Sequence, residues 1–255
     1  MISMLSVSLQ EGSLEQGYRI TWNFGVYPEV LVRNGTQIVR SVAYGLITTI
    51  ITLVIAYPLA YTIAFRGGRF KNVLLFLVIL PFFVSFIIRT LSWKFVLADE
   101  GLLLGTLKDI GVVGQGFHVL GENVAVLGGL IYNFLPFMTL PLYVALEKMD
   151  KSLLDAASDL YSSRITAFFR VTFPLSLPGV FAGSLLTFIP AVGDFINAQL
   201  LGGPQTTMIG NVIQREFLTN NDYPEAAALS FVLMAGILVG VILYARTLGT
   251  EELTG

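Results

Sequence analysis

The sequence has no cysteine and only one histidine, His118, among its 255 residues. Without cysteine there are no disulfides, thiolate nucleophiles or cysteine-based metal sites. A single histidine argues against a histidine metal cluster and a Ser-His-Asp triad. The chain also lacks the G-x-x-x-x-G-K-[ST] motif that cradles the phosphates of ATP. We therefore predict no catalytic residue, no metal ligand and no bound cofactor on this chain.

Charge is also scarce, since 13% of the residues are charged against about 25% in soluble domains. Hydrophobic residues make up 55% of the chain, and the mean hydropathy is +0.75. One water-soluble core cannot hide so much apolar surface, so lipid must solvate part of it. The net charge of −2 excludes a nucleic-acid binder that works by neutralising phosphates.

Long apolar runs set the fold class. A membrane-spanning helix needs roughly 20 apolar residues, and five segments approach or exceed that length. We predict an all-α, polytopic transmembrane bundle with spans at about 41–65, 72–88, 123–146, 179–193 and 224–245. Several spans contain proline, which membrane helices tolerate where neighbouring helices cover the freed carbonyl.

The basic residues predict an orientation, because lysine and arginine favour cytoplasmic loops. If the short loop 66–71 is cytoplasmic, then 147–178 and the tail 247–255 are cytoplasmic too. Basic residues are then about twice as dense on that side as on the other. The transmembrane domain covers 41–246, and residues 1–40 form an extracytoplasmic segment.

Five spans with a cytoplasmic C-terminus place the N-terminus on the outer side of the membrane, yet no predicted span precedes residues 1–40. Residues 1–9 are too short to cross a membrane and have no basic region before them, so they are not a signal peptide. One interpretation is that a first, sixth span is missing upstream. The other is that the helix at 41–65 translocates the N-terminal tail.

The cytoplasmic loop 147–178 does not resemble a flexible linker. Apolar residues recur at helical spacing in its first half, and a second short helix would carry an apolar stripe of Ile165, Phe168, Phe169 and Phe173. Pro174 and Pro178 are expected to end that helix before the next span. Either the loop lies back against the membrane, or its small residues allow a partner to approach closely.

Two short motifs in this loop carry a family resemblance. Asp155-Ala156-Ala157 and Val171-Thr172-Phe173-Pro174 resemble the E-A-A-x3-G-x9-I-x-L-P loop of binding-protein-dependent ABC importer permeases, and the spacing matches in full. Asp155 stands where Glu is usual and Tyr161 where Gly is usual. The resemblance implies an ATPase coupling loop formed by Leu153, Asp155, Ala156, Ala157, Leu160, Tyr161 and Pro174.

The resemblance extends over about 28–246. Segments such as 135–138, 141–143, 147–151 and 209–213 are similar to permeases of spermidine/putrescine importers. The family implies a type I importer fold with six spans in the bacterial plasma (inner) membrane. It also implies two ABC ATPase subunits that bind ATP and Mg²⁺, a second permease subunit, and an extracytoplasmic or periplasmic substrate-binding protein.

A substrate path for a cationic polyamine would need a carboxylate and aromatic faces, which attract ammonium groups. Asp194 is the candidate acid, because an ionisable group at membrane depth is costly. Phe195, Trp93, Tyr132, Phe134 and Phe82 are the candidate faces. Alternatively, Asp194 caps a helix or pairs with Arg89 or Arg215, and the aromatic residues face lipid.

Three other functions compete with this hypothesis. Related importers carry ferric iron, thiamine, molybdate or sulfate. A membrane-embedded enzyme would need a catalytic pair inside the spans, which hold no such pair. An ATP-independent channel or ion-coupled carrier usually places several ionisable groups within its helices, whereas these spans are almost free of charge.

Overall fold

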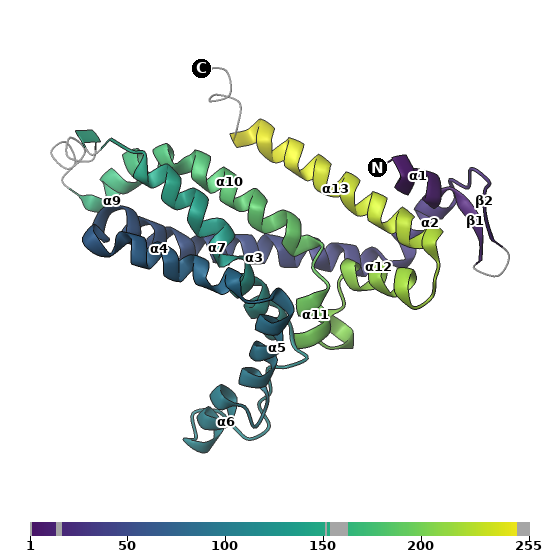
Figure 1. Cartoon of the computed structure of the whole chain (residues 1–255), viewed down its shortest axis with the longest axis horizontal. Coiled ribbons are helices and arrows are strands. Elements are labelled where there is room, and N and C mark those ends of the chain that lie inside the picture. The colour runs from purple at the N-terminus through teal and green to yellow at the C-terminus, as the bar shows by residue number, and fades with distance from the viewer. Residues whose placement is uncertain (1, 14–16, 151, 154–162, 249–255) are drawn as a thin grey trace.

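The structure is a computed structural model that describes residues 2–13, 17–150, 152–153 and 163–248. Figure 1 shows an elongated bundle of long helices. Four helical segments are long and apolar enough to cross a membrane: Gly35–Arg66, Asn123–Glu147, Ile165–Val192 and Tyr223–Arg246. They confirm the predicted spans at 41–65, 123–146 and 224–245. The predicted span at 179–193 is the second half of a longer helix.

Three helices form the centre of the bundle: α3 (Gly35–Tyr61), α7 (Asn123–Glu147) and α10 (Phe173–Val192). They lie side by side (Figure 1). Two apolar clusters lie between them, one near each end, with Leu130 and Phe134 in the first and Met138 and Leu142 in the second. Each helix also exposes apolar side chains along its outer face, as expected of helices that meet lipid.

The predicted span at 72–88 lies within a bent pair of helices that is apolar enough to be a fifth span. The chain forms η2 (Gly68–Phe70), α4 (Lys71–Ile79) and the 3-10 turn η3 (Leu80–Phe83), then α5 (Phe86–Leu97) and α6 (Leu102–Asp109). The two halves meet at an angle of 94°. Val84 has extended backbone angles, and Pro81 begins the tight turn before it, so the helix breaks there. The pair is a broken span or a re-entrant segment, and α5 and α6 point away from the bundle (Figure 1).

The expectation that Pro174 and Pro178 end a helix is also wrong. Helical structure continues through α9 (Arg164–Ala167), the π-helical turn η4 (Phe168–Thr172) and α10. Pro174 lies in the first turn of α10, where its missing N–H would otherwise bond four residues back. The π turn directly before it accommodates that loss. The last part of the predicted loop 147–178 is therefore helical.

The remaining elements lie before α3, directly after α3, or after α10 in the chain. The N-terminal part contains α1 (Ile2–Ser8), an antiparallel hairpin of β1 (Gln10–Ser13) and β2 (Gly17–Ile20), and α2 (Val26–Arg33). Helices α1 and α2 pack on α13 (Tyr223–Leu248). Between α10 and α13 lie α11 (Ile196–Leu201), η5 (Pro204–Thr206) and α12 (Ile209–Leu218). The π turn η1 (Thr62–Arg66) ends α3.

Candidate substrate path and coupling surface

A buried polar network joins three elements beside the bundle core. The amide nitrogen of Asn133 on α7 donates to Asn197 Oδ1 on α11 at 3.0 Å and to Thr90 Oγ1 on α5 at 3.1 Å. All three side chains are completely buried. In an apolar surrounding these groups are costly unless they bond to one another. The network therefore fixes the short helix α11 against α5 and α7.

Asp194 connects to this network through Asn197. The backbone N–H of Asn197 donates to Asp194 Oδ1 at 2.8 Å, and its side-chain amide donates to Oδ2 at 3.1 Å. Asp194 follows the span that ends at Val192, and burial raises the pKa of its carboxyl to about 6 despite these hydrogen bonds. The carboxylate thus satisfies the first turn of α11, which favours negative charge. Within the described residues it forms no ion pair with Arg89 or Arg215.

The other predicted path residues lie on α5, on α7 and directly before α11. Tyr132 and Phe134 flank Asn133, and the rings of Trp93 and Tyr132 meet edge to face with centroids 5.3 Å apart. Phe134 is a core residue, 5% exposed, in the cluster that includes Leu130. Phe195 is half-buried, and its carbonyl accepts a hydrogen bond from Asn211. Among the described residues of the predicted path, Asp194 is hydrogen-bonded to the network and Phe134 packs in the core. That the five residues form a substrate path stays a prediction.

Replacing Asn197 by alanine should destabilise the protein by about 1–3 kcal/mol, because it removes the side-chain donor to Asp194 Oδ2 and one of the two acceptors of the Asn133 amide. The expected result is a lower thermal unfolding midpoint in detergent. Gln199→Ala is the matched control, since Gln199 is an exposed residue on the same short helix and should leave the midpoint unchanged. Equal midpoints for both variants would contradict a structural role for the network.

Arg89, which directly follows the predicted span at 72–88, is buried in the structure. Only 7% of it is exposed. Its guanidinium carbon lies 5.7 Å from the ring centre of Phe82 and 5.6 Å from that of Phe86. Its Nε and Nη1 atoms have no hydrogen-bond partner among the described residues. Phe82, a candidate face for cargo, therefore already contacts a cation of the chain itself.

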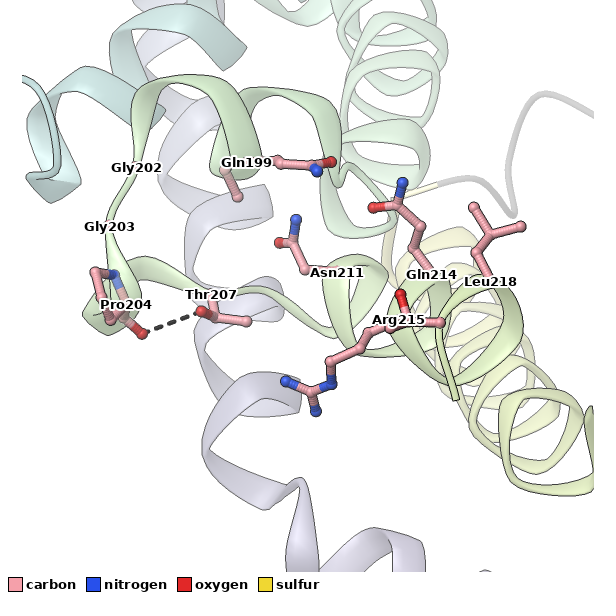
Figure 2. Close-up of a pocket in the computed structure, with 11 residues that line it drawn as sticks. Gln199, Gly202, Gly203, Pro204, Thr207, Asn211, Gln214, Arg215 and Leu218 are labelled. Carbon is pink, nitrogen blue, oxygen red and sulfur yellow. Dashed lines mark hydrogen bonds between the residues drawn. The ribbon is translucent and has the colours of Figure 1, made fainter. Parts of the chain in front are cut away.

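A polar cavity of about 430 Å³ opens between α11, η5 and α12. Figure 2 shows the side chains of Gln199, Asn211, Gln214 and Arg215 around it. Asn211 is engaged with the backbone, since its amide donates to the Phe195 carbonyl and its oxygen accepts from the N–H of Met208. Arg215 pairs with the buried Glu216 at 3.4 Å. This cavity has no signature in the sequence, because its lining comes from short, separate elements.

Most of the predicted coupling loop lies outside the described residues. This applies to Asp155, Ala156, Ala157, Leu160 and Tyr161. At its start, the N–H of Ser152 donates to Asp150 Oδ1 at 2.9 Å, and hydrogen bonds from the Ser152 backbone and side chain lower the pKa of Asp150. Leu153 is 48% exposed, and Pro174 is exposed on the outer side of α10.

The apolar stripe next to this loop is divided between two environments. Phe168 and Phe173 pack against the second core cluster, which includes Tyr57, Met138 and Leu142. Ile165 and Phe169, in contrast, are 70% and 62% exposed. Near the same end of the bundle, the Lys71 ammonium pairs with the Glu147 carboxylate and joins α4 to α7. The exposed half of the stripe is apolar surface that this chain alone does not cover.

A family model matches most of the chain. Residues 56–247 match the model described as "Binding-protein-dependent transport system inner membrane component". The match includes α4 to α12, most of α13 and the end of α3. It therefore contains the buried polar network, the polar cavity and the whole predicted coupling loop.

Individual relatives agree with that match. The chain is 39% identical over 233 residues to the spermidine/putrescine transport system permease protein PotB of Haemophilus influenzae, covering 88% of this chain and 81% of the relative. It is 40% identical over 206 residues to the Escherichia coli protein of the same name, covering 81% and 74%. A crystal structure of a bacterial ABC transporter that imports alginate has a similar fold, with a TM-score of 0.65, 17% identity, and coverage of 88% and 84%.

Proposed function

The chain belongs to the family of binding-protein-dependent transport system inner membrane components, and on that premise we propose that it forms the membrane channel of an ATP-driven polyamine importer. It is a multi-pass protein of the bacterial inner membrane. The observation that carries the cargo assignment is the 39–40% identity to two spermidine/putrescine permeases over more than four fifths of the chain.

The energy source in this proposal is a partner. The sequence has no Walker A motif to cradle ATP, so two ABC ATPase subunits would bind ATP and Mg²⁺. A second permease subunit and an extracytoplasmic or periplasmic substrate-binding protein would complete the importer. A structurally similar alginate transporter has been solved in complex with a periplasmic protein, which supports a partner of that kind.

Coupling would run through the segment that precedes α9. We assign the ATPase contact to Leu153, Asp155, Ala156, Ala157, Leu160 and Tyr161, with Pro174 at the start of the span behind them. The exposed Leu153, Ile165 and Phe169 support a partner surface here. Closure of the ATPase dimer would move this segment and swing the helices between two orientations, a rigid-body transition driven by nucleotide.

Cargo would pass the buried network, where Asp194 supplies negative charge and Trp93, Tyr132 and Phe195 supply aromatic faces. One observation favours a different cargo of the same family. Arg89 is a buried cation without a carboxylate partner among the described residues, and such a charge would suit an anion such as molybdate or sulfate.

Uptake by the reconstituted importer separates these cargoes. The chain, its ATPase, its second permease and its binding protein are placed in liposomes, and ATP-dependent uptake of radiolabelled spermidine is measured. We expect excess unlabelled spermidine or putrescine to abolish the signal, and thiamine, ferric iron, molybdate and sulfate to leave it unchanged. Uptake of molybdate or sulfate without uptake of spermidine would reject the polyamine assignment.

A further inference from the structure

One aromatic side chain touches both ends of the π-helical turn η4. Tyr57 on α3 is 8% exposed. Its ring centre lies 5.3 Å from that of Phe168, the first residue of η4, and 5.9 Å from that of Phe173, which directly follows the turn. Any change in the pitch of η4 moves Phe168 relative to Phe173. The turn is therefore held at its present length by a ring on another helix.

A hydrogen-bond chain fixes the same ring to α10. The hydroxyl oxygens of Tyr57 and Ser176 are 2.7 Å apart, and Ser176 Oγ donates to the Phe173 carbonyl at 2.8 Å. A serine hydroxyl has one hydrogen, so Tyr57 is the donor of the first bond. Ser176 is completely buried. Two bonds in series thus run from α3 into the first turn of α10.

The regular α-helical hydrogen bonding between α9 and α10 is interrupted at the turn itself. The N–H of Phe173 bonds the Phe168 carbonyl, five residues back, and Pro174 has no N–H to donate. Beyond the turn, α10 packs closely on α7, because a Cβ on Gly179 would lie 2.8 Å from the Pro141 carbonyl oxygen. The α10 side of η4 is thus held against α7. On its other side, the chain runs through α9 to the predicted coupling loop. Bending is expected where helical hydrogen bonding is interrupted.

We propose that η4 is a joint at which α9 and the coupling segment rotate against α10, and that Tyr57 is the positioning residue that locks this joint. The proposal rests on the proposed function, because it needs a partner that moves the coupling segment. With the Tyr57–Ser176 bond in place, movement of the segment is transmitted to α10. Without the bond, the turn absorbs that movement, and ATP hydrolysis continues with less transport.

The first test removes single hydroxyl groups from the reconstituted importer. For Tyr57→Phe we expect normal assembly and ATP hydrolysis, and about five-fold less cargo transported per ATP, as for the loss of one buried hydrogen bond. Ser176→Ala should have the same effect, and the double variant no larger one. Tyr61→Phe is the control, since Tyr61 lies one turn away on α3 and makes no hydrogen bond among the described residues.

An unchanged ratio of transport to hydrolysis in Tyr57→Phe would overturn the proposal, as would a parallel loss of both, which indicates a purely structural role. Failure of the wild-type importer to hydrolyse ATP or move cargo would instead reject the proposed function. The two failures are therefore distinguishable within the same experiment.

The second test measures movement directly and compares the native Tyr57 with Tyr57→Phe. Because the chain has no cysteine, paired spin labels can be introduced at chosen sites. Labels at Ile165 and Leu186 span η4, whereas labels at Leu175 and Leu186 lie within α10, and all three side chains are exposed. With the native Tyr57 we expect ATP binding to leave both distances unchanged, because the locked turn moves together with α10. In Tyr57→Phe we expect ATP binding to change the first distance and leave the second unchanged. No change in the first distance in Tyr57→Phe, or the same change with the native Tyr57, would reject the locked joint.

Discussion

Gly179→Leu should prevent stable packing of α10 against α7 and destabilise the protein by about 3 kcal/mol, the upper part of the range for overpacked cores. A Cβ at this position would lie 2.6 Å from the Ala145 Cβ, 2.8 Å from the Pro141 carbonyl oxygen and 3.2 Å from the Leu142 Cα. Two of these three atoms belong to the backbone of α7, which cannot move aside as a side chain can. Small residues allow membrane helices to approach in this way.

The same substitution on α13 is the matched control. A Cβ on Gly240 would meet no atom within 4 Å, and the residue is exposed, so Gly240→Leu should purify and melt like the unaltered chain. The measurement is the yield and thermal midpoint of the detergent-solubilised chain by size-exclusion chromatography. If the two variants have equal midpoints, the close contact between α7 and α10 does not determine stability.

Deleting residues 155–160 should abolish ATPase binding and reduce transport to background, while the membrane bundle stays folded. The deletion removes Asp155, both alanines and Leu160 from the proposed ATPase contact. The measurement is co-purification of the ATPase with the tagged chain, together with uptake and the thermal midpoint of the chain alone.

A deletion of equal size at 111–116 controls for simple shortening, since most of this stretch between α6 and α7 is exposed. We expect it to keep the ATPase bound. An importer that lacks 155–160 yet retains both its ATPase and its uptake would show that the coupling contact lies elsewhere in the chain.

The long helices were predictable because their signal is composition. Apolar runs at 41–65, 123–146 and 224–245 must avoid water, and they form helices because every backbone group in lipid needs a partner within its own segment. The same signal did not reveal the break within 72–88. Hydropathy shows that a segment is apolar, but it does not show whether the helix there is straight. The 94° bend after Pro81 was therefore not predictable from it.

The error at Pro174 has a specific physical cause. The rule that proline ends a helix assumes that the lost hydrogen bond has no replacement. Here a π turn places the preceding bond five residues back, between Phe173 and Phe168, and the helix continues. A local rule could not anticipate this, because the ring of Tyr57 that packs on the turn comes from a segment more than 100 residues away.

The candidate path was only partly readable from sequence. Asp194 was identified because charge is rare in this chain. Its main partner, Asn197, and Asn133 carry no charge, so nothing in the pattern distinguished them from other polar residues. Arg89 directly follows the predicted span at 72–88, so the sequence predicts it at the end of a helix. The structure instead breaks the helix before Arg89 and places its guanidinium over the rings of Phe82 and Phe86.

ATP dependence of cargo uptake tests most directly whether this chain is the channel of an ATP-driven importer. The complete complex is reconstituted in liposomes with ATP inside and labelled spermidine and binding protein outside. One preparation contains the unaltered ATPase, and the other contains an ATPase whose Walker A lysine is replaced. We predict uptake in the first preparation and none in the second, whatever ion gradient is applied. Equal uptake in both preparations, or uptake driven by an ion gradient without the ATPase, would contradict the proposal.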